Sequence, residues 1–248
     1  MHKAQAYMDS LLAQCGTVAP TSFLLNATQA SGLTQALSED ALNYLYSGAV
    51  SIADATQAID RGMYTWATVK LYYSLFYLAR GQLADKGVAI FYNKTKPMSV
   101  KAAAGETPKK AAGNTHKVVL NLFKTSMPNH PITSNPIDSV DAFEWMVKRR
   151  EEANYNIAKF SEPTTPKHLE KIASAGIRRS LAAYLTDSTH LYCFDRDHAI
   201  LALPAELLKQ NLITLRANPD RMRDERKYLA GLFSDRLGPI AEAMNLFK

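Results

Sequence analysis

The stretch Arg149–Tyr155 (RREEANY) holds the residues of this chain whose types and spacing best suit chemistry. On a helix, Arg150 and Asn154 lie four positions apart and therefore share one face, one turn from each other. Arg150 also falls in register with an apolar face, where an arginine must be paired or must line a polar pocket. Together with Tyr155, the set offers a cationic donor fork, an amide and a phenol, which could hold a phosphate or order a loop.

An imidazole for acid–base chemistry has one candidate source, His116, at the start of a helix expected at Asn114–Ser126. The alternative interpretation is that His116 caps its helix or pairs locally. The six histidines are scattered, and no pair has the helical spacing of metal ligands. The sequence also lacks a Walker loop, a Rossmann glycine fingerprint, an HExxH motif and a nucleophile elbow. We therefore expect neither a metal site nor a cofactor.

A second charged feature is the segment 93–113, which carries five lysines against a single acid, Glu106. Its two prolines and two glycines predict a mobile basic loop. Lysines without interleaved aromatic residues attract a phosphate backbone but do not read bases. Two interpretations remain open, a solvated surface loop and a nucleic-acid contact. The candidate binding residues are Lys94, Lys96, Lys101, Lys109, Lys110 and Lys117.

Composition limits the class of protein. The 248 residues suffice for one large domain or two small ones, and 47% hydrophobic residues argue against global disorder. The net charge of +6 is compatible with an acidic partner such as RNA or DNA. No apolar run approaches the roughly 18 residues that span a bilayer, so we expect no membrane association.

The N-terminus is too polar for a secretory signal, which makes the cytoplasm the expected compartment. The two cysteines, Cys15 and Cys193, lack the spacing of a zinc site or a redox pair. Both lie among apolar neighbours, so we expect buried free thiols.

The element that must position the Arg150 region is a helix expected at Gly62–Lys86. It is apolar on two sides, which predicts a place in the middle of a helical bundle. One face is expected to carry Trp66, Val69, Tyr73, Phe76 and Leu83, and the other Leu71, Leu75 and Leu78. Gly87 lies where a left-handed cap would end this helix. A preceding helix, with Ser38 as its N-cap, should form an antiparallel hairpin with it.

The remaining segments complete an all-α protein of about eight helices with at most trivial strand. We expect an N-terminal helix and connector at 1–37, a helical bundle at 38–163 and a C-terminal helical extension at 164–248. The expected elements are helices at 1–15, Asn114–Ser126 and Ile137–Ile157, a strand or loop at Val88–Tyr92, a strand or linker at Leu191–Phe194, and a last helix pair divided at Gly238 and Pro239.

Three segments between Ser38 and Glu162 resemble the HEPN family of helical domains. They are the helix with YYSLFYLAR, the helix start NTHKVVLNLF and the late segment RREEANY. The resemblance implies a helical bundle that often dimerises. It also implies a setting in RNA cleavage, toxin–antitoxin pairs or antiphage defence.

The chain departs from the family at one position. Catalytic members resemble metal-independent ribonucleases with an Arg-x(4–6)-His motif, whereas here Arg150 is followed by Asn154 and Tyr155. A neutral tyrosine, with a pKa near 10, is a poor general base at pH 7 compared with an imidazole near 6.5.

Three functions remain open. The first is a non-catalytic HEPN-like subunit of a prokaryotic defence or toxin–antitoxin assembly, acting as a homodimer or with a protein encoded nearby. The second is a divergent metal-independent ribonuclease built from Arg150, Asn154, Tyr155 and His116. The third is a nucleic-acid-binding module that uses the basic loop at Lys94–Lys117.

Overall fold

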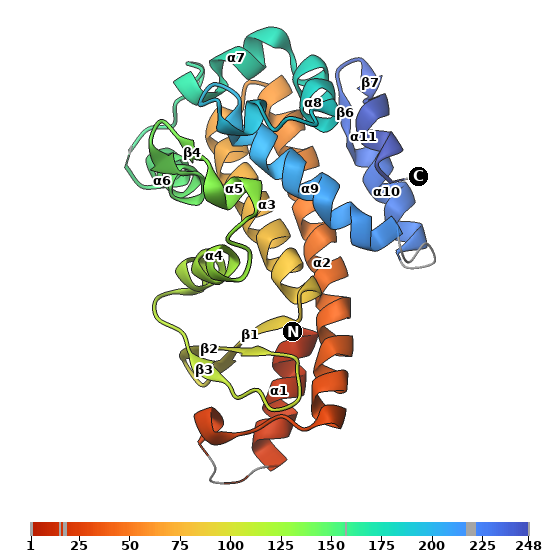
Figure 1. The fold of residues 1–248 in the computed structure, drawn as a ribbon. Helices are drawn as coiled ribbons and strands as arrows, with labels where there is room; N and C mark the ends of the chain where they lie inside the picture. The colour runs from red at the N-terminus through yellow and green to blue at the C-terminus, as the bar shows by residue number, and fades with distance from the viewer. Residues whose placement is uncertain (1, 15, 17–18, 157, 217–221, 248) are drawn as a thin grey trace. The chain divides into compact units, whose positions relative to one another are not determined.

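The computed structural model describes residues 2–14, 16, 19–156, 158–216 and 222–247, and the chain is mostly helical over them (Figure 1). The helical character agrees with the predicted fold class. Eleven α-helices lie in this part of the chain. Strand content is small, as expected, and the strand that was one alternative at Val88–Tyr92 is present as part of a small sheet within residues 88–110. Cys15 and the expected helix end at Ile157 lie outside the described residues.

The chain forms two compact units that are built from alternating pieces of sequence. Unit 1 is Met1–Tyr44 with Ala79–Ser126, and unit 2 is Leu45–Leu78 with Met127–Lys248. Helices α2 (Ala27–Asp60) and α3 (Tyr64–Asp85) each contribute to both units. The units therefore cut across the expected boundaries at residues 37 and 163. Two of their limits, 44/45 and 78/79, fall inside α2 and α3, and the third lies between Ser126 and Met127, where a proline-containing loop begins.

Unit 1 combines helices with an antiparallel sheet. Besides its parts of α2 and α3, it contains α1 (Lys3–Gln14), a 3₁₀ turn η1 (Pro20–Ser22), β1 (Val88–Asn93), β2 (Lys96–Lys101), β3 (Lys109–Lys110) and α4 (Thr115–Ser126). Met8, Leu33 and Phe91 are among its fully buried core residues. The buried carboxylate of Asp40 accepts hydrogen bonds from the backbone N–H groups of Lys3 (2.8 Å) and Ala4 (2.9 Å) at the positive end of α1.

The start of α2 corrects the expected connector and the expected N-cap at Ser38. The helix begins eleven residues earlier, at Ala27, where Asn26 and Gln29 cap each other through backbone N–H groups, both at 2.9 Å. Gly32 belongs to the segment expected to contain the connector, but it lies inside the helix. A Cβ atom at this position would collide with the ring of Tyr7, so the glycine permits close packing rather than a break.

The expected basic loop is in fact largely a β-sheet. β1 and β2 pair antiparallel from Val88↔Lys101 to Asn93↔Lys96, and β3 pairs with β2. Lys94 lies in the two-residue turn with φ of 57°. Met98 and Val100 are buried on one face of β2, an alternation that the surrounding lysines obscured in the sequence.

Unit 2 is helical with two very short hairpins. Besides its parts of α2 and α3, it contains α5 (Pro131–Ser134), β4 (Pro136–Ile137), β5 (Val140–Asp141), α6 (Ala142–Asn154), α7 (Lys167–Ala175), α8 (Ile177–Thr186), η2 (Tyr192–Phe194), α9 (Ala199–Arg216), α10 (Arg223–Leu232), β6 (Ser234–Asp235), β7 (Gly238–Pro239) and α11 (Ala241–Asn245). The segment Leu191–Phe194, expected to be a strand or a linker, contains a 3₁₀ turn, and the helix expected from Ile137 begins at Ala142.

The core of unit 2 forms where α2, α3 and α9 meet. Leu71, Leu75 and Leu78 are fully buried, as expected for that face of α3. The Ser74 hydroxyl donates to the Gly48 carbonyl (3.0 Å), and the Asn211 side-chain amide donates to the Leu78 carbonyl (3.2 Å). These bonds tie α3 to both neighbouring helices inside the core.

The expectations for Gly87 and Cys193 are confirmed, and the expectation for Trp66 is wrong. Gly87 has φ of 74° and ends α3, as predicted. Cys193 is a buried free thiol, and burial raises its pKa to about 12. Trp66, however, was expected in the core and is 44% exposed, with its ring edge against Phe160.

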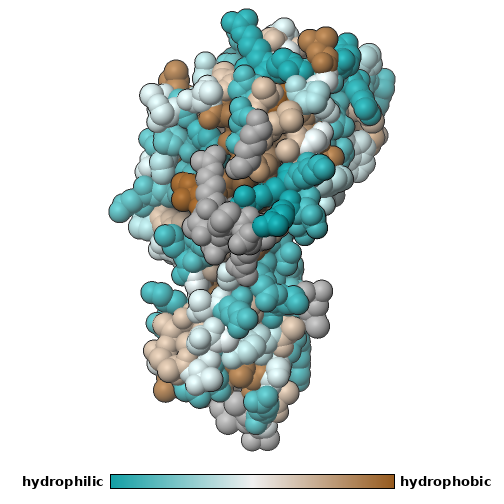
Figure 2. All heavy atoms as spheres, turned by 90° about the vertical axis from the view of Figure 1, so that its right-hand side faces the viewer, coloured by the Kyte–Doolittle hydropathy of each residue, from teal (hydrophilic) through white to brown (hydrophobic). Residues whose placement is uncertain are grey.

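Within the described part of the chain, no helix is both long and apolar enough to cross a membrane. Hydrophilic residues cover much of the face in Figure 2, and strongly hydrophobic residues occur there as separate spots.

Candidate functional site

Arg150 is held by aromatic rings. Its side chain is 13% exposed, and its guanidinium carbon lies 5.0 Å from the ring centre of Tyr72 and 5.3 Å from that of Tyr155. Nη2 donates to Glu151 at 3.3 Å. Burial raises the pKa of Tyr72 to about 12, against the opposing effect of Arg150, so Tyr72 stays neutral. The expectation that Arg150 must be paired therefore matches its surroundings.

The other candidate catalytic residues gather only in part. Tyr155 follows α6 and is 66% exposed, and Asn154 is half-buried at the last position of the helix. His116 lies on α4 in unit 1, whereas Arg150 belongs to unit 2. Among the described residues, no histidine hydrogen bonds to Arg150 or stacks on it.

The neighbouring Arg149 contacts a different set of groups. Its guanidinium carbon lies 5.3 Å from the ring centre of Trp145, and Nη1 pairs with Glu152 at 2.9 Å. Its Nε atom, like that of Arg150, is buried and finds no hydrogen-bond acceptor within the described chain. A buried donor without an acceptor is uncommon in native proteins.

Arg149 and His168 of α7 both line a pocket of about 270 Å³. The Nε2 atom of His168 lies 2.9 Å from the Thr68 hydroxyl, which itself donates to the Tyr64 carbonyl at 3.0 Å. The tautomer of His168 decides which of the two groups donates this hydrogen bond. Burial, and next the charge of Arg149, lower the pKa of His168 to about 4, so the ring is neutral at pH 7.

The pocket wall is fixed by a carboxylate at the start of α3. Glu162 accepts hydrogen bonds from the backbone N–H and the hydroxyl of Thr65, both at 2.7 Å. Although partial burial opposes its ionisation, these hydrogen bonds lower the pKa of Glu162. The carboxylate thus caps α3 and anchors the chain next to Ser161, which lines the pocket.

The sequence did not indicate this pair of residues. Arg149 and His168 are nineteen positions apart, and the segment between them includes a loop. Consecutive arginines on a helix necessarily point in different directions, and only Arg150 fell on the apolar face. The one available signal was a histidine directly after the Pro-Lys start of α7.

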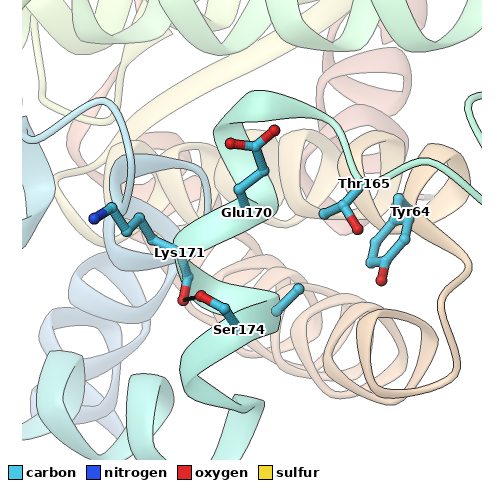
Figure 3. Close-up of a pocket in the computed structure, with 6 residues that line it drawn as sticks. Tyr64, Thr165, Glu170, Lys171 and Ser174 are labelled. Carbon is cyan, nitrogen blue, oxygen red and sulfur yellow. Dashed lines mark hydrogen bonds between the residues drawn. The ribbon is translucent and has the colours of Figure 1, made fainter.

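A second hollow lies beside α7 and is lined by Tyr64, Thr165, Glu170, Lys171 and Ser174 (Figure 3). Lys171 extends away from Tyr64 and Thr165, and the one bond drawn joins the Ser174 hydroxyl to the Lys171 carbonyl (3.1 Å). Its polar groups do not converge on one point.

The candidate nucleic-acid surface lies on unit 1. All six candidate lysines are exposed, and within the described residues none of them forms an ion pair. Unit 1 contains ten lysines and arginines against five acids, whereas unit 2 contains nineteen against eighteen. Nearly all of the net charge therefore belongs to unit 1, where the sheet orders the lysines from Lys96 to Lys110.

Within the described residues, no cluster of histidine, cysteine and carboxylate side chains could hold a metal ion. No protein family model, curated protein or solved structure matches this chain. The fold and surfaces define a mostly helical protein with a basic, sheet-bearing unit and a helical unit that contains a cation-lined pocket.

Proposed function

We propose that this protein is a HEPN-like, non-catalytic subunit of a prokaryotic defence or toxin–antitoxin assembly, and that unit 1 binds RNA. The observation that carries the RNA-binding proposal is the set of six exposed lysines between Lys94 and Lys117, none of which forms an ion pair with another described residue. Protein lysines that neutralise phosphates release condensed counterions, which drives sequence-independent binding. The working compartment in this proposal is the cytoplasm, where the RNA and the partner protein are found.

The surroundings of Arg150 favour binding over cleavage. A ribonuclease of the HEPN kind needs an imidazole close to its arginine, and here the guanidinium contacts Tyr72, Tyr155 and Glu151 instead. The phenol of Tyr155 is a weak base at pH 7. Ribonuclease activity through Arg150, Asn154, Tyr155 and His116 is the second candidate, and it requires a rearrangement that brings an imidazole to Arg150.

The test measures binding and integrity of the same labelled single-stranded RNA in EDTA. We expect affinity to fall steeply with salt, and the Lys109→Ala/Lys110→Ala variant to reduce the slope of log K against log salt by about 1.4, at about 0.7 for each phosphate contact with a single strand. The matched control is Lys159→Ala/Lys171→Ala, which removes two exposed lysines of unit 2. The RNA should stay intact.

Equal losses in the two double variants would refute the assignment of binding to unit 1. Cleavage in EDTA that disappears in Arg150→Ala would replace the proposal with the ribonuclease.

A further inference from the structure

We propose that His130 is a pH-sensitive latch in unit 2, which holds the short helix α5 against α9 while the imidazole is neutral and releases α5 when the imidazole becomes charged. The latch lies within Met127–Lys248 and does not depend on RNA binding by the lysines of unit 1. α5 and the hairpin of β4 and β5 pack against α6, the helix that carries Arg150. Release of α5 therefore loosens the chain that leads into α6.

His130 joins α5 to α9 through both of its ring nitrogens. As the N-cap of α5, it accepts a hydrogen bond at Nδ1 from the backbone N–H of Ile132 (3.2 Å). Its Nε2 atom lies 2.5 Å from the Oε1 atom of Gln210 on α9. A backbone N–H group only donates, so Nδ1 carries no proton. The neutral ring therefore carries its proton on Nε2 and donates it to Gln210.

The α9 side of the contact requires the same tautomer. Gln210 donates through Nε2 to the Oε1 atom of Glu206 at 2.9 Å. A carboxylate only accepts, so it fixes the amide of Gln210 with its nitrogen towards Glu206 and its oxygen towards His130. Glu206 is itself held in place, because Lys209 pairs with Oε2 at 2.6 Å and His190 lies 3.1 Å from Oε1. His130 thus ends a hydrogen-bond chain whose direction is fixed.

A second proton on the His130 ring breaks this arrangement. It goes to Nδ1, where it meets the N–H group of Ile132, and the acceptor that caps α5 is lost. Burial lowers the pKa of His130, and the charge of His190 acts in the same direction, against the hydrogen bond from Gln210 and the charge of Glu206. A released imidazole binds a proton more readily than the latched one, so acid favours release.

His190 responds to acid in the opposite way. Its Nε2 atom faces the Glu206 carboxylate, so a proton on His190 adds a charge-assisted hydrogen bond and strengthens that contact. The charged and titratable groups on the α9 side of His130 are therefore Glu206, its partner Lys209, and His190 from the segment before η2. α5 itself carries no titratable side chain. Release in acid is thus specific to His130.

The test measures amide hydrogen exchange by NMR in the full-length protein at pH 7 and pH 5, corrected for the intrinsic pH dependence of exchange. The reporters are Ile132, Thr133 and Ser134, whose N–H groups donate to the ring or the carbonyl of His130. We expect their opening equilibrium to rise several-fold in acid. A released imidazole with a pKa of about 6.5 limits the rise to about 25-fold. Amides in the middle of α9 should not follow.

His130→Asn is the matched variant, because asparagine caps a helix through its side-chain oxygen and does not titrate. We expect the acid response of the α5 amides to vanish in His130→Asn and to persist in His168→Gln, which removes the other buried histidine of unit 2. Equal responses in the two variants, or none in the wild type, would overturn the proposal. If His130→Asn does not fold, the wild type alone decides: opening of α5 at a pH where the His130 ring signals do not titrate would exclude the latch.

Discussion

Arg149 and Arg150 are neighbours in the chain, yet each is held by its own aromatic ring and its own carboxylate. Trp145 and Glu152 hold the first, and Tyr72 and Glu151 hold the second. A planar guanidinium can stack and donate hydrogen bonds at the same time, which an ammonium cannot do. One turn of α6 therefore offers two cationic groups, and only Arg149 lines a pocket together with a histidine.

His168 should make stability depend on pH. Its pKa is about 4 in the folded protein and about 6.5 when unfolded, so the unfolded chain binds more protons between these values. The contribution of neutral His168 to the free energy of unfolding is therefore complete above about pH 6.5, and it is lost as the pH falls towards 4. At pH 5 we expect a loss of about 2 kcal/mol in the free energy of unfolding.

Urea denaturation at pH 7 and pH 5 tests this expectation. In His168→Gln, the amide can still hydrogen bond to Thr68 but does not titrate. The free energy of unfolding of this variant should therefore fall between pH 7 and pH 5 by about 2 kcal/mol less than that of the wild type. Parallel pH profiles for the wild type and the variant would contradict a neutral, buried His168.

At the level of elements, the packing of α2 against α3 depends on their close approach at Gly48. A Cβ atom at Gly48 would lie 2.5 Å from the Leu78 side chain in the core of unit 2. Gly48→Ala should therefore destabilise the protein by about 1–3 kcal/mol, although alanine favours helix by about 1 kcal/mol. The control is Gly231→Ala in α10, where nothing lies within 4 Å and a gain of up to about 1 kcal/mol is expected.

Chemical denaturation of both variants gives the comparison. Equal stabilisation by the two substitutions would show that the helices can separate at Gly48 without cost.

The elements also show how far the sequence alone could lead. The 3.6-residue period predicted α3, and the fully buried Leu71 and Leu78 bear it out. Propensity misplaced the start of α2, because Gly32 reads as a break until Tyr7 is known to fill the space beside it. Lysines hid the strand β2, whose period-two signal rests on Met98 and Val100. The pocket could not be predicted, since tertiary packing alone joins Arg149 to His168.

At the scale of the whole molecule, the expected dimer or hetero-oligomer needs an apolar surface. Trp66 and Phe160 are 44% and 51% exposed, with ring centres 5.9 Å apart. Aromatic residues are enriched in interfaces, so this pair is a candidate contact. We expect light scattering to give twice the chain mass of 27.5 kDa and Trp66→Glu to give the monomer mass.

Leu237→Glu serves as the control, because Leu237 is 85% exposed on a separate hairpin. A monomeric wild-type protein would contradict the dimer, and a dimeric Trp66→Glu variant would exclude this surface.

The two long helices have a practical consequence for protein engineering. Within unit 1, the guanidinium carbon of Arg80 on α3 lies 4.8 Å from the ring centre of Tyr44 on α2. The place where the chain leaves this unit, after Tyr44, is therefore adjacent to the place where it returns, at Ala79. A short designed turn in place of residues 45–78 would connect Tyr44 to Ala79, so that unit 1 becomes one uninterrupted segment of sequence. The lysine-bearing sheet could then be made as a miniature protein, free of every residue that lines the α7 pocket.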